Sequence, residues 1–209
     1  MSQSRRRSLA VALAGLALLV VCGALAHGGR VGAAERRVFH WINDLPQWMY
    51  RFFWVCQQFG NLAVAFALAV AIAVALRKPR VAGAAGAAVL LKLVGERIVK
   101  KVVKRQRPGR TIGNVVLRGN VPAHGLSFVS GHAVITAAIA TILTPLLPGR
   151  WKAVPWVVVV LNGVARVYVG AHNPLDILGG VGLGLAIGGI INAVMPSPTR
   201  VPSGVAATA

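Results

Sequence analysis

Acidic residues are scarce in this chain. Only 4 of its 209 residues are Asp or Glu, against 23 Lys and Arg, so the formal net charge at pH 7 is +19. A carboxylate-ligated metal centre needs several acids close together. The acids here are scattered, at Glu35, Asp44, Glu96 and Asp176. The sequence therefore shows no cluster of carboxylates that could hold a metal.

The excess of positive charge limits which molecules the protein is expected to bind. Basic loops beside anionic membrane lipid are one explanation, and an anionic substrate is a sharper one. Nucleic acid is disfavoured, because the basic residues border apolar segments and carry no aromatic platform on which bases could stack.

Cysteine is also rare. Cys22 lies in an apolar run and Cys56 lies beside aromatic residues. Their spacing fits neither a disulfide framework nor a thiolate metal site, so we interpret both as small buried hydrophobes.

Apolar residues, by contrast, are abundant. They make up 56% of the chain, against about 45–50% in a typical soluble domain, and the mean hydropathy is +0.68. Their runs approach the length of a membrane span, so the sequence predicts an all-α polytopic membrane helical bundle with about six transmembrane helices. The expected spans cover residues 9–26, 61–76, 81–91 with a basic continuation, 130–147, 154–169 and 174–195.

Composition divides the chain into four parts. Residues 1–32 hold a basic start and the first span, which also resembles a signal peptide with an Ala-Leu-Ala cleavage site; we favour retention, because six spans give a consistent topology. Residues 33–60 mix aromatic residues with Arg and are expected to form an interfacial amphipathic helix. Residues 61–195 form the membrane core, and residues 196–209 a Pro- and Ser-rich disordered tail.

Polar residues gather at the ends of these spans. Because consecutive spans alternate in direction, the loop after the third span and the loop after the fifth lie on the same membrane face. Ionisable residues at such places are costly and usually functional. The residues brought to this face are Lys100, Arg107, Ser130, His132, Arg166, His172 and Asp176.

Two short motifs begin the fourth and sixth spans. Ser130 can cap a helix whose first turn offers free N–H groups to a phosphate oxygen, although a plain capped helix start explains it too. Pro174 fits the first position of the sixth span and Asp176 the third. The Asp176 carboxylate can then fix one nitrogen of His172 and leave the other as a nucleophile or base. The simpler alternative is an acid that balances the helix dipole.

Three cations accompany these motifs. Lys100, Arg107 and Arg166 could be lipid-facing charges whose side chains reach the interface. Guanidinium and ammonium groups also bind phosphate oxygens. Cations beside two histidines and an acid are what phosphoryl transfer requires.

Together the motifs resemble the signature of the type 2 phosphatidic acid phosphatase (PAP2) superfamily. The pattern is Lys-x6-Arg-Pro, then Ser-Gly-His, then Arg-x5-His-x3-Asp, in that order over residues 100–176. Two positions depart from the family pattern: Val129 replaces Pro and Ala165 replaces Ser.

The resemblance implies a metal-independent, integral-membrane lipid phosphatase, so we expect neither a metal nor another cofactor at its site. His172 would attack phosphorus and form a phosphohistidine, Asp176 would orient it, and His132 would protonate the leaving lipid oxygen. The phosphate would be held by Lys100, Arg107, Ser130, Gly131 and Arg166. The substrate would be a lipid phosphate or a polyprenyl diphosphate. A lipid phosphotransferase with the same site and a non-catalytic protein that binds anionic lipid are the alternatives.

Three further expectations concern charge. Glu96 precedes Lys100 by four residues and is expected to pair with it. The cations at Lys101, Lys104, Arg105 and Arg110 indicate either a substrate with more than one negative charge or contact with lipid. Basic residues in short loops mark the cytoplasmic side. They place the N-terminus inside and the candidate site on the external or periplasmic face of the cell membrane.

Overall fold

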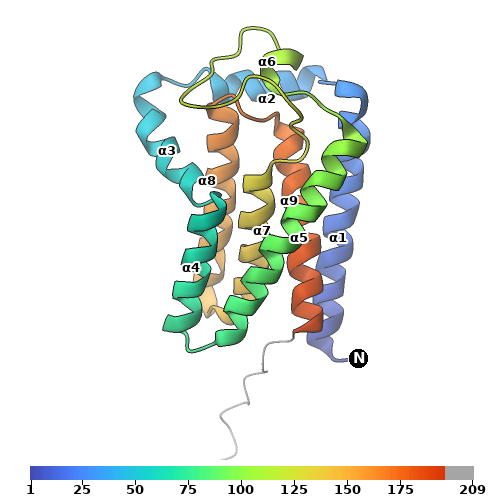
Figure 1. Ribbon diagram of the computed structural model, residues 1–209, viewed down its shortest axis with the longest axis vertical. Helices are drawn as coiled ribbons and strands as arrows, with labels where there is room; N and C mark the ends of the chain where they lie inside the picture. Colours follow the sequence, from blue (N-terminus) through green and yellow to red (C-terminus); the bar gives the residue numbers. More distant parts are fainter. Residues whose placement is uncertain (196–209) are drawn as a thin grey trace, which may run out of the picture.

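The computed structural model describes residues 1–195, so the predicted disordered tail at 196–209 lies outside the described residues. Long helices run side by side and form a bundle (Figure 1). The described chain has no β-strand beyond an isolated bridge between Gln106 and Leu126. The predicted all-α class is therefore confirmed. Its α-helices are α1 (Gln3–Ala26), α2 (Ala33–Asn43), α3 (Tyr50–Gln58), α4 (Leu62–Ala75), α5 (Pro79–Val103), α6 (Pro108–Thr111), α7 (Gly131–Leu143), α8 (Val154–Tyr168) and α9 (Pro174–Val194).

Fewer helices than expected could cross a membrane alone. By length and composition, α1 with its following turn and α9 are long and apolar enough, and a third span arises if α3 and α4, bent by 59°, count as one. Helix α7 has 13 residues and α8 has 15, so each is about 20–23 Å long at a rise of about 1.5 Å per residue. The hydrocarbon core is about 30 Å thick. A six-span topology stays a prediction.

Helix directions bring the motif-bearing ends together. Helix α5 ends, α7 begins, α8 ends and α9 begins at the end of the bundle that is covered by α2 and α6 (Figure 1). The N-terminus lies at the opposite end. The backbone N–H of Ser130 donates to the carbonyl of Asp176 at 3.0 Å, which joins the starts of α7 and α9 directly.

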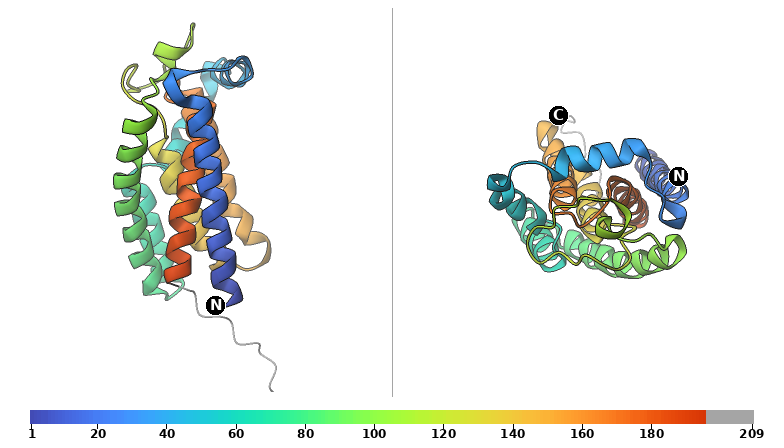
Figure 2. Two further views of the ribbon diagram at one scale, coloured as in Figure 1. Left: turned by 90° about the vertical axis from the view of Figure 1, so that its right-hand side faces the viewer. Right: turned by 90° about the horizontal axis from the view of Figure 1, so that it is seen from above.

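Helix α1 belongs to the bundle. It lies along α9 over most of its length (Figure 2), and small residues let the two backbones approach closely. A Cβ on Gly182 would lie 2.7 Å from the carbonyl oxygen of Gly15, and one on Gly189 would lie 2.7 Å from that of Ser8. Only glycine fits at these contacts.

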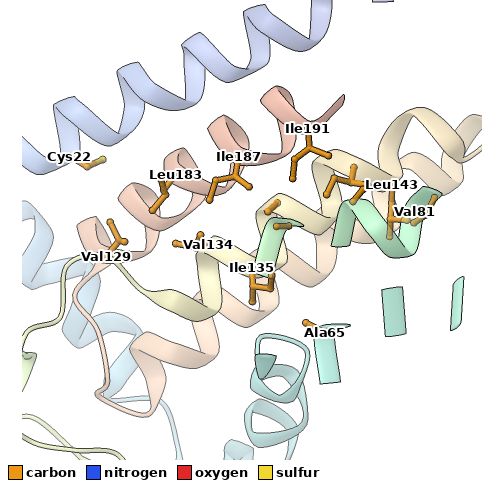
Figure 3. Packing of buried hydrophobic residues seen from close by; sticks show 14 of the residues in the cluster. Cys22, Ala65, Val81, Val129, Val134, Ile135, Leu143, Leu183, Ile187 and Ile191 are labelled. Carbon is orange, nitrogen blue, oxygen red and sulfur yellow. The ribbon is translucent and has the colours of Figure 1, made fainter. Parts of the chain in front are cut away.

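The apolar core contains Val129, one of the two departures from the family pattern. Cys22, Val129, Val134 and Leu183 lie in one buried cluster between α1, α7 and α9 (Figure 3). Val129 is fully buried there, so an apolar side chain suits the position. Cys22 and Cys56 are both buried and free, as the sequence predicted.

The region 33–60 has two different faces. Phe39 of α2 and Phe53 of α3 are buried against Tyr168 of α8, whereas the side chains of Trp41 and Trp48 are 78% and 79% exposed. Helix α2 lies across the end of the bundle, nearly perpendicular to the long helices (Figure 2, right). An interfacial helix requires this arrangement, and its placement in lipid stays a prediction.

Candidate active site

Ser130 begins α7, but its side chain does not cap the helix. Its hydroxyl oxygen is buried and has no hydrogen-bond partner in the described part of the chain. The expectation of a side-chain cap is therefore wrong. The backbone N–H of Ser130 is bonded to the carbonyl of Asp176, so the residue is held in place while its hydroxyl stays free.

Gly131, the first residue of α7, lies close to a side chain of α5. A Cβ at this position would lie 2.5 Å from Oε2 of Glu96 on α5. Glu96 also pairs with Lys92 and Lys100, with Nζ–O distances of 2.6 and 2.5 Å. The predicted pair between Glu96 and Lys100 is confirmed, and Lys100 reaches the start of α7 through this carboxylate.

The start of α9 has the geometry predicted for His172 and Asp176. Oδ2 of Asp176 accepts from the backbone N–H of Asn173 at 2.9 Å, as a capping acid does. The same oxygen lies 3.6 Å from Nδ1 of His172, which is longer than a hydrogen bond. Asp176 thus faces one imidazole nitrogen and leaves the other directed elsewhere.

His172 is poised to be neutral. It is 4% exposed, and burial lowers its pKa to about 4. The nearby charges of Arg166 and Arg107 act in the same direction, whereas Asp176 opposes the shift. A neutral imidazole at pH 7 is the form that can act as a nucleophile.

Arg107 and Arg166 converge on His172 from different elements. Nη1 of Arg107 donates to the carbonyl of Ala171 at 2.9 Å, and Nη1 of Arg166 donates to the side-chain oxygen of Gln57. The Nε atoms of both arginines are buried and have no partner within residues 1–195. Donors held this way suit the oxygens of a bound phosphate.

A polar pocket adjoins part of the candidate site. It has a volume of about 590 Å³, and both His132 and Arg166 line it. The other lining residues come from α3 and its following turn and from the loop before α7: Tyr50, Trp54, Gln57, Gln58, Asn61, Arg118, Gly119, Asn120, Val121 and Pro122. His132 and Arg166 are therefore reached from the surface that α3 borders, whereas His172 and Asp176 do not line this pocket.

The other departure, Ala165, lies away from this pocket. It is fully buried in an apolar cluster with Phe39, Phe53 and Tyr168. Its methyl group fits that apolar environment.

Sequence reasoning missed the role of Arg105. The sequence grouped it with substrate- or lipid-facing cations, but it is fully buried and pairs with Glu35 and Asp176. These partners lie about 70 residues away along the chain, so no local sequence pattern predicts the pairing. The scarcity of acids was the available signal, because each of the four acids in so basic a chain is a potential buried counter-ion.

Comparisons with known proteins concern the family and the fold of the chain. The family model of the PAP2 superfamily matches residues 81–200. The chain is 36% identical over 99 residues to decaprenylphosphoryl-5-phosphoribose phosphatase of Mycobacterium tuberculosis, which covers 46% of this chain and 51% of that protein. The match thus spans about half the length of the curated relative.

Two solved structures share the fold. LpxE of Aquifex aeolicus is 28% identical with a TM-score of 0.67, covering 74% of this chain and 92% of that one. A transmembrane PAP2-type phosphatidylglycerolphosphate phosphatase from Bacillus subtilis has a TM-score of 0.71 at 21% identity, covering 88% and 95%. The second likeness concerns the fold alone.

Proposed function

Because the chain belongs to the PAP2 superfamily of membrane lipid phosphatases, we propose that it hydrolyses a lipid phosphate or polyprenyl diphosphate through a phosphohistidine at His172. The observation that carries this proposal is the buried His172, whose Nδ1 faces Oδ2 of Asp176 at 3.6 Å, with Arg107 and Arg166 beside it. No metal takes part in the proposed reaction.

The first step is nucleophilic attack. Nε2 of His172 forms a bond to phosphorus while the bond from phosphorus to the lipid oxygen breaks. His132, which lines the pocket, donates a proton to the departing oxygen. Asp176 balances the positive charge that develops on the phosphorylated imidazole.

The second step releases phosphate. Water enters through the polar pocket, His132 accepts a proton from it, and its oxygen attacks phosphorus. The N–P bond breaks and the electrons return to His172. Arg107, Arg166, the Ser130 hydroxyl and the amide of Gly131 hold the phosphate oxygens through both steps, and Lys100 adds positive charge from α5.

An apolar pocket supports a lipid substrate. It has a volume of about 370 Å³ and lies between α4, α7 and α8. Thr136, Ile139 and Leu143 line it; they follow His132 on α7 by four, seven and eleven residues, which is one helix face. A hydrocarbon chain in this pocket would place its phosphate end toward His132.

The test is phosphate release from a polyprenyl phosphate and a polyprenyl diphosphate in detergent with a chelator present. His172→Ala should lose activity and the acid-labile phosphoenzyme together. His40→Ala is a matched control, because His40 and Asp44 have the same i,i+4 spacing in an exposed part of α2. Full activity in His172→Ala would contradict the phosphohistidine mechanism. Absence of phosphate release by the wild-type protein would instead leave binding of anionic lipid as the function.

A phosphotransferase would share the first step. Adding a lipid alcohol acceptor separates the two enzymes: a hydrolase releases inorganic phosphate at an unchanged rate, whereas a transferase moves the phosphate to the acceptor. The pocket of about 590 Å³ that leads to His132 gives water access, which favours hydrolysis.

A further inference from the structure

Arg105 sits at the centre of a buried charge network that joins α2 to the start of α9. Its Nη1 donates to Oε1 of Glu35 at 2.9 Å and to Oδ1 of Asp176 at 3.0 Å. Its Nη2 donates to Oε2 of Glu35 at 2.6 Å and to the carbonyl of Arg30 at 2.7 Å. The side chains of Arg105, Glu35 and Asp176 are 0%, 7% and 0% exposed.

This network holds the Asp176 carboxylate in one orientation relative to His172. Arg105 holds Oδ1 and the backbone of Asn173 holds Oδ2, so the carboxylate cannot rotate freely. Oδ2 is thereby the oxygen that faces Nδ1 of His172. A carboxylate fixed in this way defines both the tautomer and the ring orientation of the histidine.

Glu35 contributes in two ways. Its Oε1 also accepts from the backbone N–H of Leu175 at 2.9 Å, so it ties the first turn of α9 to α2. It also supplies a second negative charge to Arg105. Without Glu35, the single guanidinium would be available to neutralise Asp176, and the carboxylate would stabilise a positively charged imidazole less well.

We propose that Glu35 and Arg105 are positioning residues for the reaction at His172, acting through Asp176 as a buried relay from α2. This proposal rests on the proposed function, since it needs His172 as the nucleophile. The competing explanation is a purely structural role, in which the network only fastens α2 to the bundle.

The decisive measurement is the single-turnover rate of phosphohistidine formation. Glu35→Gln keeps the size of the side chain and an oxygen for Leu175, and Arg105→Lys keeps the charge. We expect Glu35→Gln and Arg105→Met to slow the step by about 10–100-fold, and Arg105→Lys by less. The affinity for vanadate, a phosphate analogue, should stay within about threefold, because neither residue contacts phosphate.

Asn43→Ala is the matched structural control. The buried Asn43 side chain fastens α2 to the end of α8 by donating to the carbonyl of Tyr168 at 2.9 Å. Its hydrogen-bond partners are Val116, Val167 and Tyr168, and none belongs to the network around Arg105. Asn43→Ala should lower the melting temperature in detergent, while the phosphorylation rate of the folded variant stays within about threefold of the wild-type rate.

Coupling to Asp176 gives a second readout. In an Asp176→Asn background, Glu35→Gln should slow phosphohistidine formation little further, because Glu35 acts through the carboxylate that this background lacks. An equal loss of rate from Glu35→Gln in both backgrounds, or wild-type rates in the folded Glu35 and Arg105 variants, would overturn the positioning role but not the proposed function. Absence of phosphohistidine in the wild-type protein would overturn the proposed function, and the positioning role with it.

Discussion

At His172, a single imidazole is subject to opposing influences. Burial and two arginines lower its pKa from 6.5 to about 4, and Asp176 opposes them. The lowered pKa means that the ring stays neutral as the pH falls from 6.5 towards 4. The proposed nucleophile should therefore remain available in mildly acidic solution.

This predicts the pH profile of the reaction. The acid limb of the kcat/KM profile reports ionisations of the free enzyme and the free substrate. The ionisation of the substrate can be followed by phosphorus NMR and corrected for. The midpoint of the corrected acid limb should lie well below pH 6.5. A midpoint near 6.5 would show that His172 is an ordinary solvated histidine or is not the nucleophile.

Glu96 is expected to have a modest role. It balances Lys92 and Lys100 beneath Gly131 and is partly exposed. We predict that Glu96→Gln raises KM by about two- to fivefold, the size of effect expected for a partly exposed ion pair. Arg166→Ala should cost far more, because it removes a phosphate ligand. Equal losses in steady-state assays of the two variants would show that Glu96 has a direct role in catalysis.

The other basic residues near the site bear on whether the substrate carries one phosphate or two. With Arg105 assigned to the interior, Lys101, Lys104 and Arg110 are the exposed members of the group. If they face the substrate, Lys101→Gln with Lys104→Gln should lower kcat/KM several-fold more for a polyprenyl diphosphate than for the monophosphate, since the diphosphate carries more negative charge. An equal loss for both substrates, with weaker vesicle binding, would instead indicate lipid contact.

At the scale of elements, the contact of α1 with α9 depends on glycine. A larger side chain at Gly182 would meet backbone atoms of Gly15 and Leu19, which cannot move aside as a flexible side chain can. Gly182→Leu should therefore lower the stability in detergent by about 1–3 kcal/mol, read as a fall in melting temperature. Gly83→Leu on α5 is the control, because nothing lies within 4 Å of a Cβ there. Similar melting temperatures in the two variants would show that α1 packs loosely.

The same contact bears on the retention of residues 1–32. A cleaved signal segment would leave the glycine face of α9 without its partner. We predict that the intact mass of the purified protein includes α1.

At the scale of the whole molecule, charge and chemistry separate to opposite ends. The cationic turn between α4 and α5 and the one before α8 lie at the end that carries the N-terminus, and the site lies at the other (Figure 1). The positive-inside rule then predicts an external or periplasmic site, where a lipid carrier phosphate would be met after export.

Labelling tests this orientation. Asn114 is exposed near the site end, so Asn114→Cys, in a background without Cys22 and Cys56, should react with a membrane-impermeant thiol reagent on intact cells. A cysteine at Arg150, near the opposite end, should react only after the cells are opened. The reverse pattern would place the site on the cytoplasmic face.

The sequence by itself determined the features that depend on neighbours along the chain. The helical class follows from the apolar runs, the capping role of Asp176 from its place three residues after Asn173, and the pairing of Glu96 with Lys100 from their i,i+4 spacing. The alternating direction of the helices was enough to expect the motifs at one end.

Only the tertiary structure decided which charges are buried together and how close the helices approach. Arg105 and Lys104 are adjacent basic residues in the sequence, yet one is fully buried between two acids and the other is exposed. Ser130 likewise looks like a helix cap, but in the structure its backbone N–H bonds to the carbonyl of Asp176 and its hydroxyl has no partner among the described residues. The reason is physical: burying a charge is favourable only when distant partners supply its counter-ions and hydrogen bonds, and those partners become neighbours only when the chain folds.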